Sequence, residues 1–126
     1  MVNALRGSGL TAHINDGRHT IVSGLPETLG GHDEGPSPHD LLESALAACT
    51  ILTVQLYADR KQWKLENINV RIGISSEGPG GNVLSRELSF TGDLDEQQRA
   101  RLLEIAEKCP IHLFLTRGAK VQTVMV

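Results

Sequence analysis

The sequence GGHDEGPSPHDLLESALAACT, residues 30–50, contains the strongest structural signals in the chain. Ser37 is a favourable helix N-cap, Pro38 suits the first helical position, and Asp40 places a negative charge in the first turn. These features predict a helix that begins at residue 38. The charged run DRK, residues 59–61, predicts its end.

Apolar residues on this helix predict that it is central and largely buried. One stripe follows the helical period and consists of Leu41, Ala45, Ala48, Cys49, Leu52 and Leu56. A second apolar stripe consists of Leu42, Leu46 and Thr53. The apolar run is interrupted by polar residues and is short for a bilayer crossing, so no membrane contact is predicted. A second subunit would help to cover such a helix in so small a chain.

The remaining sequence predicts short strands and two further helices. Residues 10–23 form two apolar runs around Asn-Asp-Gly, which favours a β-hairpin, and the glycine- and proline-rich residues 24–37 predict a long loop. Alternating apolar residues predict strands over 68–75 and 83–91. Asp95 and Gln98 resemble a capping box for a helix that ends close to Cys109. A short helix is expected from Pro110 to Gly118, and a final strand over 121–126.

The predicted order is β-β-loop-α-β-β-α-α-β, which describes a single α+β domain, residues 1–126, in which antiparallel sheets cover buried helices. Its net charge of −3 and the lack of clustered Lys and Arg give no indication of nucleic-acid binding. The first residues lack the pattern of a secretion signal, so we expect a cytoplasmic location. Permanent structural disulfides are uncommon in that compartment.

The two cysteines are the main candidates for chemistry. Cys109 directly precedes Pro110, where unpaired N–H groups and the helix dipole would favour a thiolate. Cys49 lies on an apolar stripe, where burial raises the pKa of a thiol unless a cation or a hydrogen-bond donor reaches it. Alternatively, both cysteines are small buried hydrophobic residues. Cys49, Cys109 and His112 lack the paired spacing of metal ligands, so no metal site is predicted.

Two segments resemble the OsmC/Ohr family, the osmotically induced and organic hydroperoxide resistance proteins. The first is GGHDEGPSPHDLLESALAACT, with Gly-Pro-Ser-Pro before the helix and Ala-Ala-Cys-Thr within it. The second is EQQRARLLEIAEKCPIH, residues 96–112, which is similar to the family's second cysteine motif. The resemblance covers nearly the whole chain and implies an OsmC-like fold. It also implies an intertwined homodimer with active sites at the subunit interface.

The resemblance further implies a thiol-dependent peroxidase without a bound cofactor. Cys49 would attack the peroxide and become a sulfenic acid, and Cys109 would then form a disulfide with it, which an external dithiol reductant would reduce. A thiolate that attacks the O–O bond and a second thiol that prevents over-oxidation are chemically consistent. Leu42 and Leu46 would help to line an apolar pocket that favours small organic hydroperoxides over hydrogen peroxide.

The family's active site also uses an arginine and a glutamate. Arg18, after a glycine in the hairpin turn, stands in a comparable place to that arginine. Arg86, on the apolar face of a predicted strand, is a second candidate, although its charge could instead extend to water. His39 occupies the position of the glutamate. Asp40 follows it, but the favourable interaction of an acidic side chain with the helix dipole in the first turn is sufficient to explain Asp40.

The change to His39 places the chain with the OsmC-like branch and leaves other functions open. One alternative is a non-catalytic protein that binds a lipid-like ligand, and another is an oxidant sensor. His112 could stabilise the Cys109 thiolate or transfer a proton, or it could simply pack at a helix face.

Overall fold

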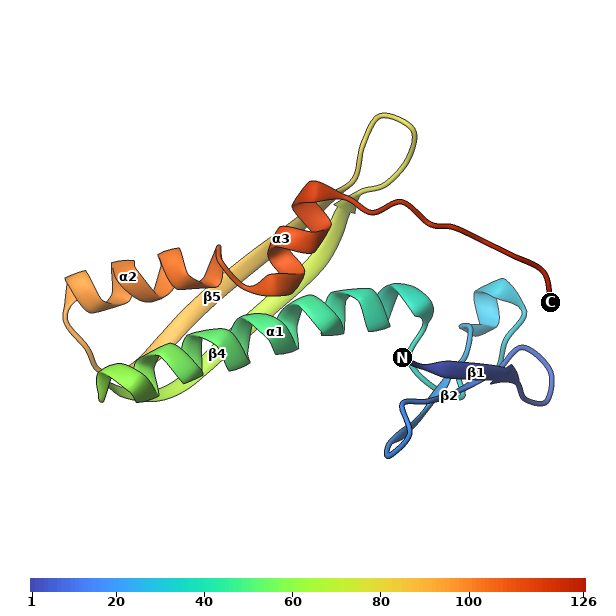
Figure 1. Cartoon of the computed structure of the whole chain (residues 1–126), viewed down its shortest axis with the longest axis horizontal. Coiled ribbons are helices and arrows are strands. Elements are labelled where there is room, and N and C mark those ends of the chain that lie inside the picture. The colour runs from blue at the N-terminus through green and yellow to red at the C-terminus, as the bar shows by residue number, and fades with distance from the viewer. The chain divides into compact units, whose positions relative to one another are not determined.

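The computed structural model describes residues 1–126 as two compact units, residues 1–42 and residues 43–126, which we describe separately (Figure 1). In the first unit, β1 (Asn3–Arg6), β2 (Ala12–Asn15) and β3 (Thr20–Ser23) form an antiparallel sheet in that order. The predicted hairpin is therefore confirmed. Strand β1 was not predicted because its four residues are all exposed and show no alternation. The predicted loop contains a short 3-10 helix, η1 (Glu27–Leu29).

Helix α1 (Pro38–Lys61) begins and ends where the sequence predicts. At its start, the Asp40 N–H donates to Ser37 Oγ at 3.1 Å, and the Ser37 N–H donates to Asp40 Oδ2 at 2.9 Å. At its end, Gln62 has a φ of +56°, the N–H of Trp63 donates to Ala58 O, and that of Gln62 to Asp59 O. This is the Schellman arrangement, with glutamine in the position that glycine usually occupies.

The buried face of α1 differs from the prediction. The buried residues are Leu46, Thr50, Val54 and Ala58. On the predicted stripe, Leu52 is 67% exposed and Leu56 is 52% exposed. The prediction failed because α1 is apolar on more than one side. The spacing of apolar residues along a helix does not show which of these sides contacts the rest of the chain. Within this chain α1 therefore has one buried face and one exposed apolar face.

The second unit is built on a long hairpin of β4 (Lys64–Ser76) and β5 (Val83–Asp93), with α2 (Glu96–Ala106) and α3 (Pro110–Arg117) following it (Figure 1). In the antiparallel register, Ile68 lies opposite Phe90, and Ile72 lies opposite Arg86. The core joins α1, β4 and α2 and consists of Val54, Ala58, Leu65, Ile68, Leu102, Ile105 and Ala106. Burying each large aliphatic side chain contributes about 1.5–3 kcal/mol.

The predicted boundaries of α2 and α3 are confirmed by their caps. Asp95 and Gln98 form the capping box at the start of α2. Cys109 is the N-cap of α3, Pro110 is its first residue, and Gly118 follows its end with a φ of +76°. Each cap satisfies backbone groups that a helix terminus leaves without partners.

The final predicted strand, residues 121–126, is not formed. A strand needs a neighbour to accept and donate its backbone hydrogen bonds, and this segment pairs with no strand of the chain.

Helix α1 is long and apolar enough to cross a membrane, judged by length and composition alone. Core helices of soluble proteins can have the same length and composition. In this fold α1 packs against β4 and α2 through the core described above.

Candidate functional site

The first turn of α3 brings the two cysteines together. Cys49, on α1, is partly exposed, whereas Cys109 has no exposed surface. The Ile111 backbone N–H donates to Cys49 Sγ at 3.5 Å, and the His112 backbone N–H donates to Cys109 Sγ at 3.3 Å. Both sulfur atoms therefore lie at the amino end of one helix, where its dipole favours negative charge.

The thiols are close enough to influence each other's protonation. Burial is the main cause that raises the pKa of the Cys109 thiol, and the neighbouring Cys49 side chain raises it further. Hydrogen bonds from the His112 N–H and the Thr50 hydroxyl act in the opposite direction. The sequence-based expectation of a Cys109 thiolate is therefore wrong for the reduced protein, because desolvation outweighs the helix terminus. Cys49 lies on the apolar helix as predicted, and the Ile111 N–H is a donor that reaches it.

Arg86 projects from β5 toward this site and is only 10% exposed. Its Nη1 atom donates to Thr50 Oγ1 at 3.0 Å and to the carbonyl oxygen of Ala106 at 3.3 Å. The interpretation that its charge extends to water is wrong, because protein acceptors surround the guanidinium. Its position on the apolar face of the strand was the sequence signal for this role.

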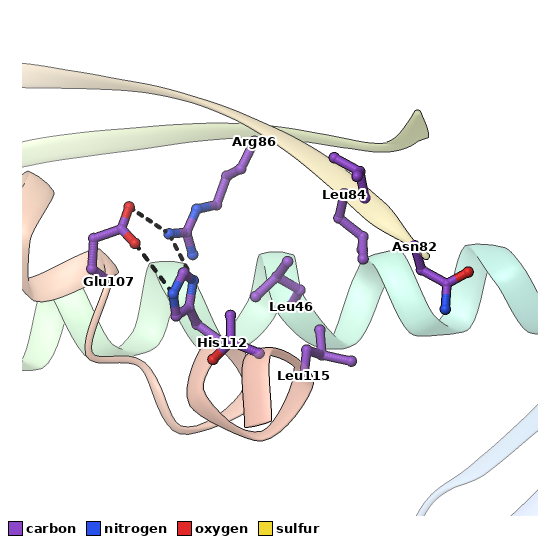
Figure 2. A pocket seen from close by; sticks show the side chains of 9 residues that line it. Leu46, Asn82, Leu84, Arg86, Glu107, His112 and Leu115 are labelled. Atoms are coloured by element: carbon purple, nitrogen blue, oxygen red, sulfur yellow. Dashed lines mark hydrogen bonds and ion pairs between the residues drawn. The ribbon is translucent and has the colours of Figure 1, made fainter. Parts of the chain in front are cut away.

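Glu107 and His112 complete the environment of Arg86 (Figure 2). Arg86 Nη2 lies 3.3 Å from Glu107 Oε1 and 3.2 Å from His112 Nδ1. His112 Nε2 lies 3.2 Å from Glu107 Oε2. The His112 imidazole therefore faces Arg86 and Glu107, and the contact of this residue with Cys109 Sγ is made by its backbone N–H.

Arg86, Glu107 and His112 form one end of a cavity of about 520 Å³ between β5, α1 and α3. Figure 2 shows Leu46, Leu84 and Leu115 beyond these three residues. The cavity thus has an ionic end and mostly apolar walls, which include Leu46. Neither sulfur atom belongs to its lining.

The other predicted site residues lie in the first unit. Arg18 is exposed in the turn between β2 and β3, where its backbone N–H donates to Asp16 Oδ1 at 2.8 Å. His39 is exposed in the first turn of α1, and Leu42 is 41% exposed. Hydrogen bonds with Ser37 lower the pKa of the Asp40 carboxyl group, in agreement with its capping role.

Thr50 and Glu107 are the site residues that the sequence did not indicate. Thr50 directly follows Cys49, but a threonine inside an apolar helix gives no functional signal by itself. Glu107 follows a predicted helix and reads as a surface charge. Their roles depend on contacts with β5 that only the folded chain makes. No group of three histidine, cysteine or acidic side chains is arranged to hold a metal ion.

Comparisons with known proteins agree with this architecture. The structure is similar to an OsmC-like protein from Mycoplasma pneumoniae, with 19% identity, a TM-score of 0.79, and coverage of 92% of this chain and 86% of that one. It is also similar to an organic hydroperoxide resistance protein from Elizabethkingia anophelis, with 25% identity, a TM-score of 0.66, and coverage of 94% and 89%. A further similar protein, from Vibrio cholerae, is described as an organic hydroperoxide resistance protein with captopril bound in an active site. That chain is 24% identical, with a TM-score of 0.65 and coverage of 94% and 85%.

A search of curated protein sequences gives no significant match. The sequence profile of the family described as OsmC-like protein, however, matches residues 31–124, which include both cysteine motifs. The predicted α+β fold is confirmed by the structural similarity. The chain therefore belongs to the OsmC-like protein family.

Proposed function

We propose that the protein is a thiol-dependent peroxidase that reduces organic hydroperoxides. The observation that carries this proposal is the meeting of Cys49 and Cys109 at the first turn of α3, although they lie far apart in the sequence. Two neighbouring thiols can pass from dithiol to disulfide when the backbone geometry allows the bond. Structural relatives described as organic hydroperoxide resistance proteins support the same reaction.

The difference in burial supports Cys49 as the cysteine that attacks the peroxide and Cys109 as the resolving cysteine. A hydroperoxide can reach the partly exposed Cys49 but not the wholly buried Cys109. The Cys49 thiolate attacks the outer oxygen of the hydroperoxide, the O–O bond breaks, and the alkoxide takes up a proton to leave as an alcohol. Cys109 then attacks the Cys49 sulfenic acid, forms the disulfide and releases water. An external dithiol reductant restores both thiols and closes the cycle.

The exposed apolar face of α1 supports a homodimer and a preference for organic substrates. Ala45, Ala48, Leu52 and Leu56 are exposed on the helix that carries Cys49. Exposed apolar patches commonly mark interaction surfaces, and a second copy of the chain placed there would enclose Cys49 in an apolar pocket. Such a pocket binds the alkyl part of an organic hydroperoxide and gains little from hydrogen peroxide. We place this activity in the reducing cytoplasm, where a dithiol reductant would be available.

The cavity beside Arg86 favours a second candidate function, the binding of a lipid-like ligand. It has apolar walls and does not include the sulfur atoms, so it could hold a ligand without thiol chemistry. In that case the cysteines would not be required for the function.

Turnover of cumene hydroperoxide with dithiothreitol or dihydrolipoamide separates the two candidates. We expect the parent protein to consume cumene hydroperoxide faster than hydrogen peroxide, and Cys49→Ser to lose this activity. Ala100→Ser is a suitable control, because it introduces the same hydroxyl at an exposed position of α2, outside the face of α1 that carries Cys49. Equal, slow consumption by the parent and by Cys49→Ser would reject the peroxidase and favour the binding protein.

A further inference from the structure

Thr50 is a buried residue next to Cys49 whose hydroxyl contacts Arg86. Its side chain has no exposed surface, and its hydroxyl donates to the carbonyl oxygen of Leu46 at 2.7 Å. The same oxygen accepts a hydrogen bond from Arg86 Nη1 at 3.0 Å. A hydroxyl has one proton and two acceptor positions, so it can donate to only one partner at a time. Cys109 lies beside this group, because the Ala106 carbonyl oxygen that accepts from Arg86 Nη1 also accepts from the Cys109 backbone N–H at 3.4 Å. A hydrogen bond from Thr50 favours the charged form of the Cys109 thiol.

Arg86 holds the Thr50 oxygen in one place. Guanidinium groups only donate hydrogen bonds and keep their charge at any ordinary pH. Arg86 is fixed by the Ala106 carbonyl oxygen, Glu107 and the His112 ring, and it is 10% exposed. Because its donor occupies one acceptor position of Thr50, the O–H bond remains free to turn between Leu46 and Cys109. Burial strengthens each of these interactions relative to water.

We propose that Thr50 and Arg86 are positioning residues for the resolving cysteine, with the Thr50 hydroxyl turning from the Leu46 carbonyl to the Cys109 sulfur whenever that sulfur is negatively charged. This inference rests on the proposed function. Thr50 supplies the hydrogen bond, and Arg86 polarises the hydroxyl and stabilises the thiolate through it. No other cation than Arg86 contacts the Thr50 hydroxyl.

The pair acts in both halves of the cycle. In the oxidative half, Cys109 loses its proton and attacks the Cys49 sulfenic sulfur, so that the S–S bond forms and the S–O bond breaks. The departing hydroxide takes up a proton and leaves as water. In the reductive half, a dithiol attacks the more exposed Cys49 sulfur, and Cys109 leaves as a thiolate. A hydrogen bond that stabilises this leaving thiolate accelerates reduction as well.

A titration that needs no peroxide tests the inference directly. In the Cys49→Ser background, Cys109 is the remaining cysteine, and its thiolate can be followed by ultraviolet absorbance against pH. The matched variant that also carries Cys109→Ser supplies the baseline, including the absorbance of the tyrosine. We expect Thr50→Val and Arg86→Met to move thiolate formation to higher pH, whereas Thr50→Ser and Arg71→Met leave it unchanged. Arg71 is a suitable control because it lies on the same hairpin but is 79% exposed.

Sulfenic acid trapping in the protein with both cysteines gives the second readout. After one equivalent of cumene hydroperoxide, Thr50→Val should form the disulfide about tenfold more slowly than the parent. Circular dichroism verifies that each variant is folded, and Arg86→Lys retains a cation if Arg86→Met does not fold. Unchanged titration and disulfide formation in Thr50→Val would overturn the inference. Failure of the parent to form a sulfenic acid would instead reject the proposed peroxidase, while the titration would still test the Thr50–Arg86 pair.

Discussion

Arg86 fixes which ring nitrogen of His112 carries the proton. Its Nη2 atom lies 3.2 Å from His112 Nδ1, and arginine can only donate, so Nδ1 must accept. The neutral imidazole therefore carries its proton on Nε2, which lies 3.2 Å from the Glu107 carboxylate. A second proton on the ring would place an N–H opposite Arg86 and break this contact.

The tautomer of His112 is a direct test of this arrangement. Nitrogen NMR under conditions where the His112 ring is neutral should show its proton on Nε2. Arg86→Met should reduce this preference, because Nδ1 then loses its donor. Arg71→Met, on the exposed side of the same hairpin, should leave the His112 signals unchanged. An Nδ1-protonated ring in the parent would contradict the geometry.

Removal of the resolving thiol should separate the two chemical steps. Without added reductant, we expect Cys109→Ser to react with one equivalent of hydroperoxide and to accumulate the Cys49 sulfenic acid, because the protein has no second thiol to attack it. Mass spectrometry after dimedone labelling should find the adduct on Cys49 only. A Cys109→Ser variant that turns over with dithiothreitol as fast as the parent would show that Cys109 takes no part in resolution.

The raised pKa of the Cys109 thiol predicts a loss of stability at alkaline pH. The unfolded chain releases this proton near the ordinary thiol pKa of about 8.5, whereas the folded protein retains it to higher pH. The stabilisation is therefore complete below about pH 8.5 and is lost as pH rises through the folded-state pKa. Denaturant unfolding of the reduced protein should show this decline, and Cys109→Ala should show a smaller one. Equal slopes for the two proteins would contradict the shift.

The exposed apolar face of α1 predicts a dimer that a charge would disrupt. Leu52→Glu should shift the protein toward the monomer in analytical ultracentrifugation, because Leu52 is 67% exposed within one chain. Leu103→Glu is the matched control, since Leu103 is 50% exposed but lies on α2. A parent protein that is monomeric at all concentrations would remove the basis of this prediction.

Packing between α1 and α2 should dominate the stability of the second unit. Leu102 has no exposed surface, and Leu102→Ala should lower the free energy of unfolding by about 2–5 kcal/mol through lost burial and a cavity. Leu103→Ala, one residue along α2, should change it by about 0.5 kcal/mol or less. Chemical denaturation followed by circular dichroism measures both. Similar losses for the two variants would contradict the assigned core.

Local sequence signals predicted the caps and strands well, because they depend on neighbouring residues. Ser37 and Asp40 form the expected reciprocal cap, and Asp95 and Gln98 form the capping box. The alternation along β5 also placed Arg86 on the inner face of the hairpin. It did not show which groups Arg86 contacts, because Thr50 and His112 belong to distant segments.

The sequence alone determined the order of most elements, both cysteine motifs and membership of the family. Tertiary structure decided which side of α1 is buried, since apolar residues occur on more than one side and only contact with β4 and α2 selects between them. It also decided the protonation of Cys109, because the desolvation of a thiol depends on everything packed around it. Finally, residues 121–126 remain unpaired within the chain, since a β-strand exists only beside a partner for its backbone.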